Sequence, residues 1–297
     1  MSRVGLLVNP ASGDGRAQRL GARLRDVLLH SGHEVVDLAA SDGASARQIS
    51  RAAVHDGRID ALAVVGGDGT VHIGANACAG TGVPLAILAA GTGNDNARAL
   101  GLGAGDVALT ARLLGAARVK PVDLGRSRGI NGRADRWWLG VLGGGFDTVV
   151  NQRARRIRWV HGTARYVAAV AAELRTFRGF RYAVHVDGER IKTTAMLVAV
   201  GNGVAFGGGM RVCPDARMDD GLLDVTIVHQ VSRREFVRVF PKVFRGAHVD
   251  HPAVHMLRGR TVRLAATGVR TQADGEDFLA LPVTLEAAPA ALRVCAP

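Results

Sequence analysis

Val64-Val65-Gly66-Gly67-Asp68-Gly69-Thr70 is the stretch that decides the fold. The apolar residues from Ala61 to Val65 predict a buried parallel strand, and the glycines after them predict a turn at its carboxyl end. Glycine tolerates positive φ and leaves no Cβ between backbone N–H groups and a ligand, so this turn can wrap phosphate oxygens. The Asp68 carboxylate would repel an anion unless Mg²⁺ lies between carboxylate and phosphate. The stretch therefore predicts a metal–nucleotide site at the end of a strand.

Strands and helices alternate on both sides of this stretch. We expect strands over 3–8, 34–38, 61–65, 83–88 and 118–123, and helices over 16–30, 44–55, 71–79, 94–100 and 106–116. Such alternation predicts an α/β domain with a parallel sheet and helices on both faces. Ligands of these sheets bind beyond the carboxyl ends of the strands, where all the glycine-rich turns fall.

The remainder of the chain has a different pattern. We expect strands over 137–142, 181–187, 195–200, 223–229, 261–265 and 281–285, with one helix over 154–175. This predicts a mainly antiparallel β-sandwich as a second domain. We place the nucleotide-binding domain at 1–122 and the β-sandwich domain at 123–290, and residues 291–297 can return to the first domain.

Composition limits the class of protein. The chain has 297 residues, 47% of them hydrophobic, and no apolar run approaches the ~20 residues of a membrane span. The apolar run Gly5–Val8 ends too early for a signal peptide, so we expect a cytoplasmic protein. The cysteines Cys78, Cys213 and Cys295 lack metal-ligand spacing. We interpret them as packing residues and exclude zinc chemistry.

The charge of the chain predicts an anionic partner. The net charge is +12, which fits nucleic acid, a nucleotide or an acidic membrane surface. Aromatic residues make up only 4%, too few for a base-stacking platform, so we exclude nucleic acid. The basic stretch Arg153–Arg165 with Trp159 predicts either a helix on anionic lipid or a solvated basic face. We take the first reading, which makes the protein peripherally membrane-associated. We expect its ten histidines to be surface or cap residues.

Two more glycine-rich turns follow strands. Asn9–Gly15 opens a helix, and its Ser12 and glycine N–H groups suit either phosphate or ordinary helix capping. Ala89–Asp95 offers the Thr92 hydroxyl and the Asn94 amide to phosphate or ribose, while Asp95 is suited to cap the next helix. Because this turn and Gly66–Thr70 follow adjacent strands, we expect them to converge.

Two acidic turns lie in the second domain. Asp215–Asp224 predicts either a divalent-cation site or a solvated turn entering a hairpin. Ala273–Asp277 predicts either a bare hairpin turn or a carboxylate that faces the first domain and serves as general base.

Five motifs together resemble the diacylglycerol kinase catalytic-domain family, which includes the sphingosine and ceramide kinases. They are Asn-Pro-x-Ser-Gly at 9–13, Gly-Gly-Asp-Gly-Thr at 66–70, Gly-Thr-Gly-Asn-Asp at 91–95 with Arg98 following, Asp-Asp-Gly-Leu-Leu-Asp at 219–224 and Asp-Gly-Glu at 274–276. They stand in the family's order and span nearly the whole chain. The resemblance implies a cleft between the two domains, ATP and Mg²⁺ as cofactors, and a lipid substrate at a membrane surface.

The resemblance also implies site residues. Those matching the ATP site are Asn9, Pro10, Ala11, Ser12, Gly13, Ser41, Gly66, Gly67, Asp68, Gly69, Thr70, Gly91, Thr92 and Asn94. Asp68 would face the Mg·ATP phosphates. Asp220, with main-chain oxygens of Arg217 and Leu222, resembles a structural magnesium site. Asp274 and Glu276 fall where the family has its catalytic carboxylate, and the sequence does not decide which of them takes the proton.

The chain departs from the family at two places. Val71-His72-Ile73 replaces Leu-Asn-Glu, which removes an acid near the nucleotide, and Asn96 replaces an aromatic residue. We expect a kinase that phosphorylates the hydroxyl of diacylglycerol or a related lipid. An NAD kinase-like enzyme, which shares Gly-Gly-Asp-Gly-Thr, is one alternative, and a non-catalytic lipid- or nucleotide-binding paralogue is another. An exposed sheet edge would allow a homodimer.

Overall fold

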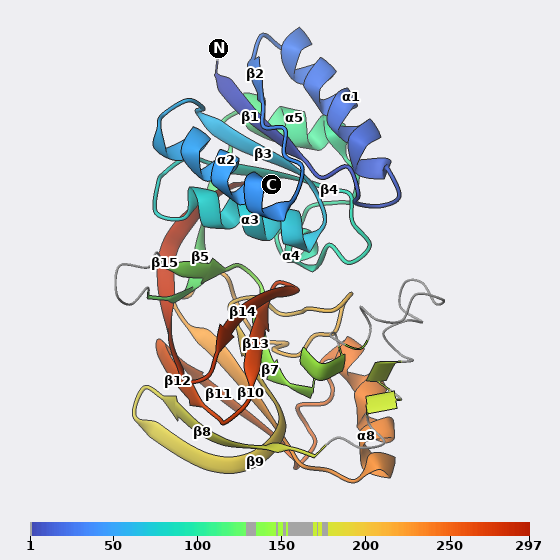
Figure 1. Cartoon of the computed structure of the whole chain (residues 1–297), viewed down its shortest axis with the longest axis vertical. Helices are drawn as coiled ribbons and strands as arrows, with labels where there is room; N and C mark the ends of the chain where they lie inside the picture. Colours follow the sequence, from blue (N-terminus) through green and yellow to red (C-terminus); the bar gives the residue numbers. More distant parts are fainter. Residues whose placement is uncertain are drawn as a thin grey trace.

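The computed structural model describes residues 2–128, 135–146, 148–150, 153, 169–170, 172–173 and 178–297. The predicted helix over 154–175 and the basic stretch Arg153–Arg165 lie outside the described residues, apart from the few positions just given. Two lobes follow one another along the long axis of the molecule, and both chain ends lie in the same lobe (Figure 1). No helix of the described residues is both long and apolar enough to cross a membrane.

The lobe that holds the chain ends contains a parallel sheet. Its strands are β1 (Arg3–Val8), β2 (Glu34–Asp37), β3 (Ala61–Gly66) and β4 (Leu85–Ala89), in the order β2-β1-β3-β4. Helices α1 (Arg16–His30) and α5 (Val107–Gly115) pack together on one face, and α2 (Gly43–His55) and α3 (Asp68–Cys78) pack together on the other, with the short α4 (Asp95–Ala99) below them (Figure 1). The predicted α/β fold is therefore confirmed.

Local sequence explains these elements. Leu20, Leu24 and Leu28 form the buried stripe of α1 at four-residue spacing. The Asp42 side chain accepts from the backbone N–H groups of Ala44 and Ser45 and so caps α2. Helix α3 begins at Asp68 rather than at the predicted Val71, because the glycine turn passes directly into helical backbone.

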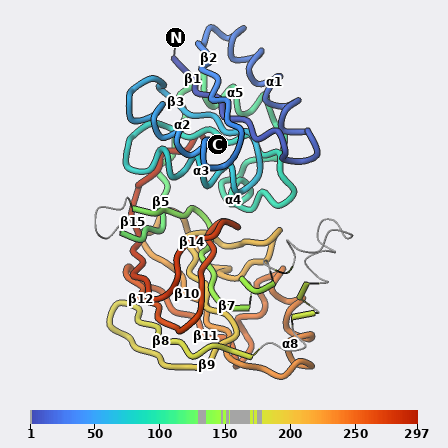
Figure 2. The backbone as a smooth tube through the Cα atoms, viewed as in Figure 1, coloured from blue at the N-terminus to red at the C-terminus, as the bar shows by residue number. Residues whose placement is uncertain are grey.

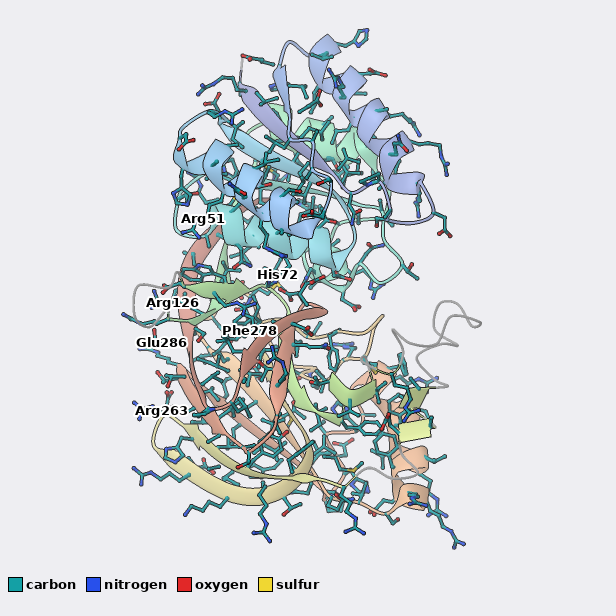
Figure 3. The ribbon with its side chains drawn as sticks, viewed as in Figure 1. Arg51, His72, Arg126, Arg263, Phe278 and Glu286 are labelled. Atoms are coloured by element: carbon teal, nitrogen blue, oxygen red, sulfur yellow. The ribbon has the colours of Figure 1, made fainter. Side chains whose placement is uncertain are left out.

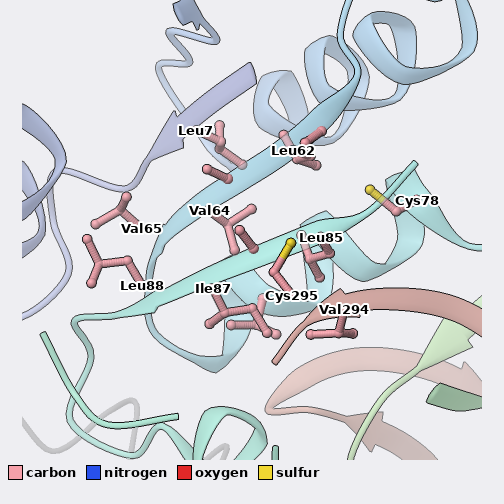
Figure 4. Close-up of a cluster of buried hydrophobic side chains, with 14 of the residues drawn as sticks. Leu7, Leu62, Val64, Val65, Cys78, Leu85, Ile87, Leu88, Val294 and Cys295 are labelled. Atoms are coloured by element: carbon pink, nitrogen blue, oxygen red, sulfur yellow. The ribbon is translucent and has the colours of Figure 1, made fainter. Parts of the chain in front are cut away.

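The core of this lobe surrounds β3, all of whose residues are buried. Side chains of β3 and β4 pack there with Val294 and Cys295 from the end of the chain (Figure 4). The three cysteines are free and buried. Burial raises the pKa of the Cys78 and Cys213 thiols to about 12 and that of Cys295 to about 11, so these thiols stay protonated.

The second lobe is mostly antiparallel. Its strands are β5 (Val119–Ser127), β6 (Arg136–Trp138), β7 (Val141–Gly145), β8 (Phe180–Val186), β9 (Glu189–Gly201), β10 (Leu223–His229), β11 (Val254–Gly259), β12 (Thr261–Ala265), β13 (Arg270–Ala273), β14 (Glu276–Ala280) and β15 (Val283–Cys295). Helix α8 (Arg233–Val239) continues into a 3₁₀ turn, η1 (Phe240–Arg245). One predicted strand is wrong: 137–142 is divided between β6 and β7, because the N–H groups of Leu139 and Gly140 bond the Asp274 carboxylate instead of a strand.

Strand β15 joins the two lobes. Its first half pairs with β12, and near its end Val294 pairs in parallel with Leu85 of β4. The described strands consequently belong to one continuous sheet. The tube in Figure 2 shows the last segment climbing from the lower lobe into the upper one. Strands β13 and β14 form a hairpin whose tip lies beneath α3 and α4 (Figure 1).

Candidate active site

The three glycine-rich turns meet beyond the carboxyl ends of β1, β3 and β4. A Cβ built on Gly91 would lie 2.5 Å from the Cα of Gly67, and one built on Gly13 would lie 2.3 Å from the Ala90 carbonyl oxygen. Gly13 also has φ +63°. Only glycine fits at these contacts, and the three turns meet there without side chains between them. The Ser12 hydroxyl borders the turns, 3.7 Å from a Cβ built on Gly67.

Asparagine side chains fix the shape of the turns. The Asn94 amide lies across its own turn, accepting from Gly91 N at 3.0 Å and donating to Gly91 O at 2.8 Å. Asn9 Nδ2 donates to Thr70 Oγ1 at 3.4 Å, and Asn9 Oδ1 accepts from Ala11 N at 3.2 Å. These polar groups are held by the turns themselves, so they preorganise the site. Around them, Pro10, Ala11 and Thr92 are exposed, as is Ser41 just before α2, while Gly66 is buried.

Asp68 and Asp95 place two carboxylates beside these turns. Asp68 Oδ1 accepts from Asn96 N at 3.0 Å, while its Oδ2 lies 2.9 Å from a Cβ built on Gly93. Burial raises the pKa of the Asp68 carboxyl, and the Asp95 charge adds to that shift. A buried carboxyl beside a second acid forms a site that a cation stabilises.

The expectation that Asp95 caps the following helix is wrong. The N-cap residue of α4 is Asn94, and Asp95 is the first helical residue. Asp95 Oδ2 accepts from Gly208 N of the second lobe at 2.7 Å, and Asp95 also pairs with Arg98. Sequence reasoning missed this role, although Asp95 is the last residue of the Gly-Thr-Gly-Asn-Asp motif.

Asp274 and Glu276 occupy different environments. The Asp274 side chain is 1% exposed, and its oxygens accept from Leu139 N at 3.0 Å and Gly140 N at 2.8 Å. Glu276 is partly exposed, and its Oε1 lies 2.8 Å from a Cβ built on Gly69. Glu276 therefore reaches across from the hairpin to the first turn of α3, next to the glycine turns.

His72 contradicts the expectation of a surface or cap histidine. It is buried, and its Nδ1 lies 3.0 Å from Asp274 Oδ2. It occupies the space between α3 and the strand that carries Phe278 (Figure 3). One turn further along α3, Asn76 donates to Trp137 O at 3.0 Å and accepts from Trp137 N at 3.1 Å. Helix α3 is thus attached to the second lobe on one face, and its amino end points at the glycine turns.

A polar pocket of about 450 Å³ opens between α2, α3 and the hairpin. It is lined by Arg47, Arg51, His72, Ile73, Asn76, Ala77, Asp135, Arg136, Glu276 and Asp277. Burial and the Arg47 charge lower the pKa of Arg136. Glu276 is a shared wall between this pocket and the glycine turns. Arg51 lies on its α2 side (Figure 3).

An apolar cavity of about 90 Å³ lies in the second lobe. Its lining is Phe146, Met196, Leu197, Phe206, Met210, Val212, Val228, Val231, Phe236, Val239, Phe240, Val243, His248, His251, Ala253 and Val254. Burial lowers the pKa of His248, which favours its neutral form in this lining. Phe206 and Met210 belong to the same short loop as Gly208, the partner of Asp95, so one loop borders both the cavity and the carboxylates.

The predicted magnesium turn is closed by an arginine. Asp220 Oδ1 accepts from Leu222 N at 3.0 Å, and Asp220 Oδ2 lies 3.8 Å from an Arg258 nitrogen. Arg258 also binds Asp224 at 3.1 Å, while Arg217 binds Asp219. Within the described ranges, no group of three His, Cys, Asp or Glu side chains is placed to hold a metal ion. Magnesium at Arg217, Asp220 and Leu222 stays a prediction.

Comparisons with known proteins agree with this architecture. Residues 3–127 match the family described as "Diacylglycerol kinase catalytic domain", and residues 140–296 match "YegS C-terminal NAD kinase beta sandwich-like domain". A protein of Mycobacterium tuberculosis named diacylglycerol kinase is 40% identical over 298 residues, covering 100% of this chain and 96% of that protein. One of Bacillus subtilis with the same name is 25% identical over 281 residues, covering 93% of this chain and 90% of that protein. A crystal structure of a diacylglycerol kinase from Bacillus anthracis has a TM-score of 0.71 at 22% identity and covers 99% of this chain and 97% of that one.

Proposed function

The chain belongs to the diacylglycerol kinase catalytic-domain family of lipid kinases, and on this premise we propose that it transfers the γ-phosphoryl group of ATP, with Mg²⁺, to the hydroxyl of diacylglycerol or a closely related lipid. One observation carries the proposal. Glu276 faces the first turn of α3 and the glycine turns, while the loop that holds Asp95 also lines an apolar cavity. A phosphate site, a base and a lipid-compatible cavity therefore adjoin.

The nucleotide side of the reaction needs phosphate binding and charge neutralisation. The touching turns at Gly13, Gly67 and Gly91 let a phosphate approach the backbone without side chains in the way, and the amino end of α3 adds its dipole. The polar pocket beside them is of the size that ligand-binding pockets have, ~300–1,000 Å³. We assign the phosphates to the turns and the nucleoside to this pocket.

Asp68 fits a magnesium ion that is shared with phosphate oxygens. Magnesium sites of this kind use one or two carboxylates together with substrate phosphates, so a group of three protein acids is not needed. The raised pKa of Asp68 fits this role, because a cation relieves the cost of its buried charge. When bound, the ion neutralises charge on the transferred phosphoryl group.

Glu276 is our general base. Its carboxylate is partly exposed and lies next to the turns, where a lipid hydroxyl in line with the γ-phosphate would sit. Asp274 has both oxygens engaged by buried backbone N–H groups, and His72 contacts one of them. We therefore assign Asp274 to holding the β13–β14 hairpin in place, which positions Glu276.

The acceptor binds on the side of the second lobe. The cavity lining is apolar, and the loop of Phe206 and Met210 leads from it to Asp95. An acyl chain in the cavity would place a glycerol hydroxyl toward Glu276. A dinucleotide, the acceptor of an NAD kinase, carries phosphates and sugars that such a lining cannot hydrogen-bond.

Radiolabelled phosphate transfer from ATP to diacylglycerol, a sphingoid base and NAD, offered in parallel, tests the proposal. We expect product with the diacylglycerol only, and loss of that product in Glu276→Gln. Transfer to NAD would identify an NAD kinase. ATP binding without transfer to any acceptor would identify the non-catalytic paralogue that Ile73 motivates.

A further inference from the structure

We infer that the outer face of α8 and η1, over Arg233–Arg245, docks on an anionic phospholipid bilayer. This inference rests on the proposed function, because it assigns the route by which a membrane-embedded lipid reaches the cavity. The segment lies at the outer edge of the second lobe (Figure 1). Its residues divide into an inner face, which lines the cavity, and an outer face, which is exposed.

The inner face belongs to the cavity. Phe236, Val239, Phe240 and Val243 line it at helical spacing. Phe236 and Phe240 stack with ring centroids 5.4 Å apart, and Phe146 packs edge-on against Phe236 at 5.2 Å. These contacts fix the rotation of the segment about its axis, so the orientation of the opposite face is fixed as well.

The outer face combines cations with exposed apolar side chains. Arg234, Arg238, Lys242 and Arg245 are exposed, and Val237 and Phe244 between them are 62% and 41% exposed. Four large hydrophobic residues are exposed among the described residues. Val237 is the most exposed of them, and Phe244 is the only aromatic one.

Acidic groups do not compensate these cations. Across the described parts of the chain, no ion pair forms at Arg234, Arg238, Lys242 or Arg245. Glu235 is the one acid of the segment, and its Oε1 lies 3.2 Å from His251 Nε2.

An anionic bilayer matches this face in both respects. Its phosphates attract the cations, and its interface accepts Val237 and Phe244 at the depth of the headgroups. A nucleic acid would bind the cations but leave the apolar side chains of Val237 and Phe244 exposed to water. Since the inner side of the same segment lines the cavity, a lipid leaving the bilayer at this face has a short way to enter it.

Vesicle co-sedimentation tests the inference without requiring turnover. The probe is phosphatidylcholine vesicles with and without phosphatidylglycerol, at low and high salt. We expect binding that needs phosphatidylglycerol and weakens with salt. Arg234→Glu with Arg238→Glu removes two cations, each worth roughly fivefold in partitioning, so binding should fall at least ~25-fold. Phe244→Ser should weaken the binding that remains at high salt.

Helix α1 provides a matched control. Arg19→Glu with Arg23→Glu makes the same charge change on another exposed helix, one that also exposes Val27 and Leu29. The control pair should retain vesicle binding, and both pairs should retain the wild-type melting temperature. Equal losses in the two pairs would reduce the effect to net charge and overturn the inference. Undiminished vesicle binding in Arg234→Glu with Arg238→Glu would also overturn the inference. Loss of self-association in that variant, with vesicle binding retained, would do the same.

A second readout separates this inference from the proposed function. Phosphorylation of a short-chain, monomerically dispersed diacylglycerol should be unchanged in Arg234→Glu with Arg238→Glu, whereas phosphorylation of the same lipid class in vesicles should fall. If no lipid is phosphorylated by the wild type but the vesicle results hold, the proposed function fails and the docking face stands.

Discussion

Replacing Asp274 by asparagine is the sharpest test of how the two acids of the hairpin differ. Asp274 Oδ1 accepts from Gly140 N, and Oδ2 accepts from Leu139 N and contacts His72 Nδ1. An amide has one oxygen and one NH₂ group. In either orientation its NH₂ group would point at a buried backbone N–H. Asparagine tolerates the positive φ of +52° at this position, so the backbone conformation itself is not perturbed.

The magnitude follows from these contacts. A buried donor left without an acceptor costs ~1–3 kcal/mol, and hydrogen bonds to a charged group contribute ~1.5–3 kcal/mol. Asp274→Asn should thus destabilise the fold by about 3 kcal/mol, allowing for partial relaxation. At ~2–4 °C per kcal/mol, the melting temperature should fall by roughly 6–12 °C.

Differential scanning calorimetry and a phosphate-transfer assay together decide the outcome. Glu276→Gln is the matched control: it is partly exposed, so its stability should stay within ~0.5 kcal/mol of wild type. Its turnover should fall ~10²–10⁴-fold, the usual worth of a general base. An Asp274→Asn protein with unchanged melting temperature and no activity, beside an active Glu276→Gln, would refute the reasoning and make Asp274 the base.

Three further substitutions test the other parts of the site. In Gly91→Ala the new Cβ would lie 2.5 Å from the Cα of Gly67, so ATP binding, measured by calorimetry, should be abolished. The control Gly103→Ala places its Cβ with nothing within 4 Å and should bind ATP like the wild type. Asp68→Asn should abolish turnover yet melt at or above the wild-type temperature at pH 7. Since the folded-state pKa of Asp68 is raised, ionising it costs stability above the unfolded value of 3.8, so this advantage should vanish as the pH falls toward 3.8. Ala253→Phe fills the cavity of about 90 Å³ and should raise KM for long-chain diacylglycerol while ATP affinity stays constant. An unchanged KM would remove the acyl chain from the cavity.

Local sequence was sufficient to predict that the glycine turns converge. Each glycine turn directly follows an apolar strand, so its position depends on a few neighbouring residues. The order of parallel strands then brings the ends together, and the contact between Gly67 and Gly91 is a consequence of β3 and β4 being adjacent. The fold class was predictable for the same reason.

Long-range contacts were not predictable in this way. His72 and Asp274 are 202 residues apart, and Asp95 and Gly208 are 113 apart. Neither helical nor strand periodicity carries information about such pairs. A histidine on a helix looks the same in sequence whether it faces water or a carboxylate of another lobe. The choice between Asp274 and Glu276 depends on that contact, so the motif Asp-Gly-Glu left it open.

The loop of Gly208 connects Asp95, beside the glycine turns, with the apolar cavity. Gly207, Gly208 and Gly209 all have positive φ, and a Cβ on Gly208 would meet nothing within 4 Å. Glycine is therefore required at 208 by backbone conformation and not by space. That conformation points the Gly208 N–H at Asp95 while Met210 packs into the cavity wall. Because the two contacts lie only two residues apart in the chain, we expect a shift of one to displace the other. A loop built from ordinary residues would satisfy one site at the expense of the other.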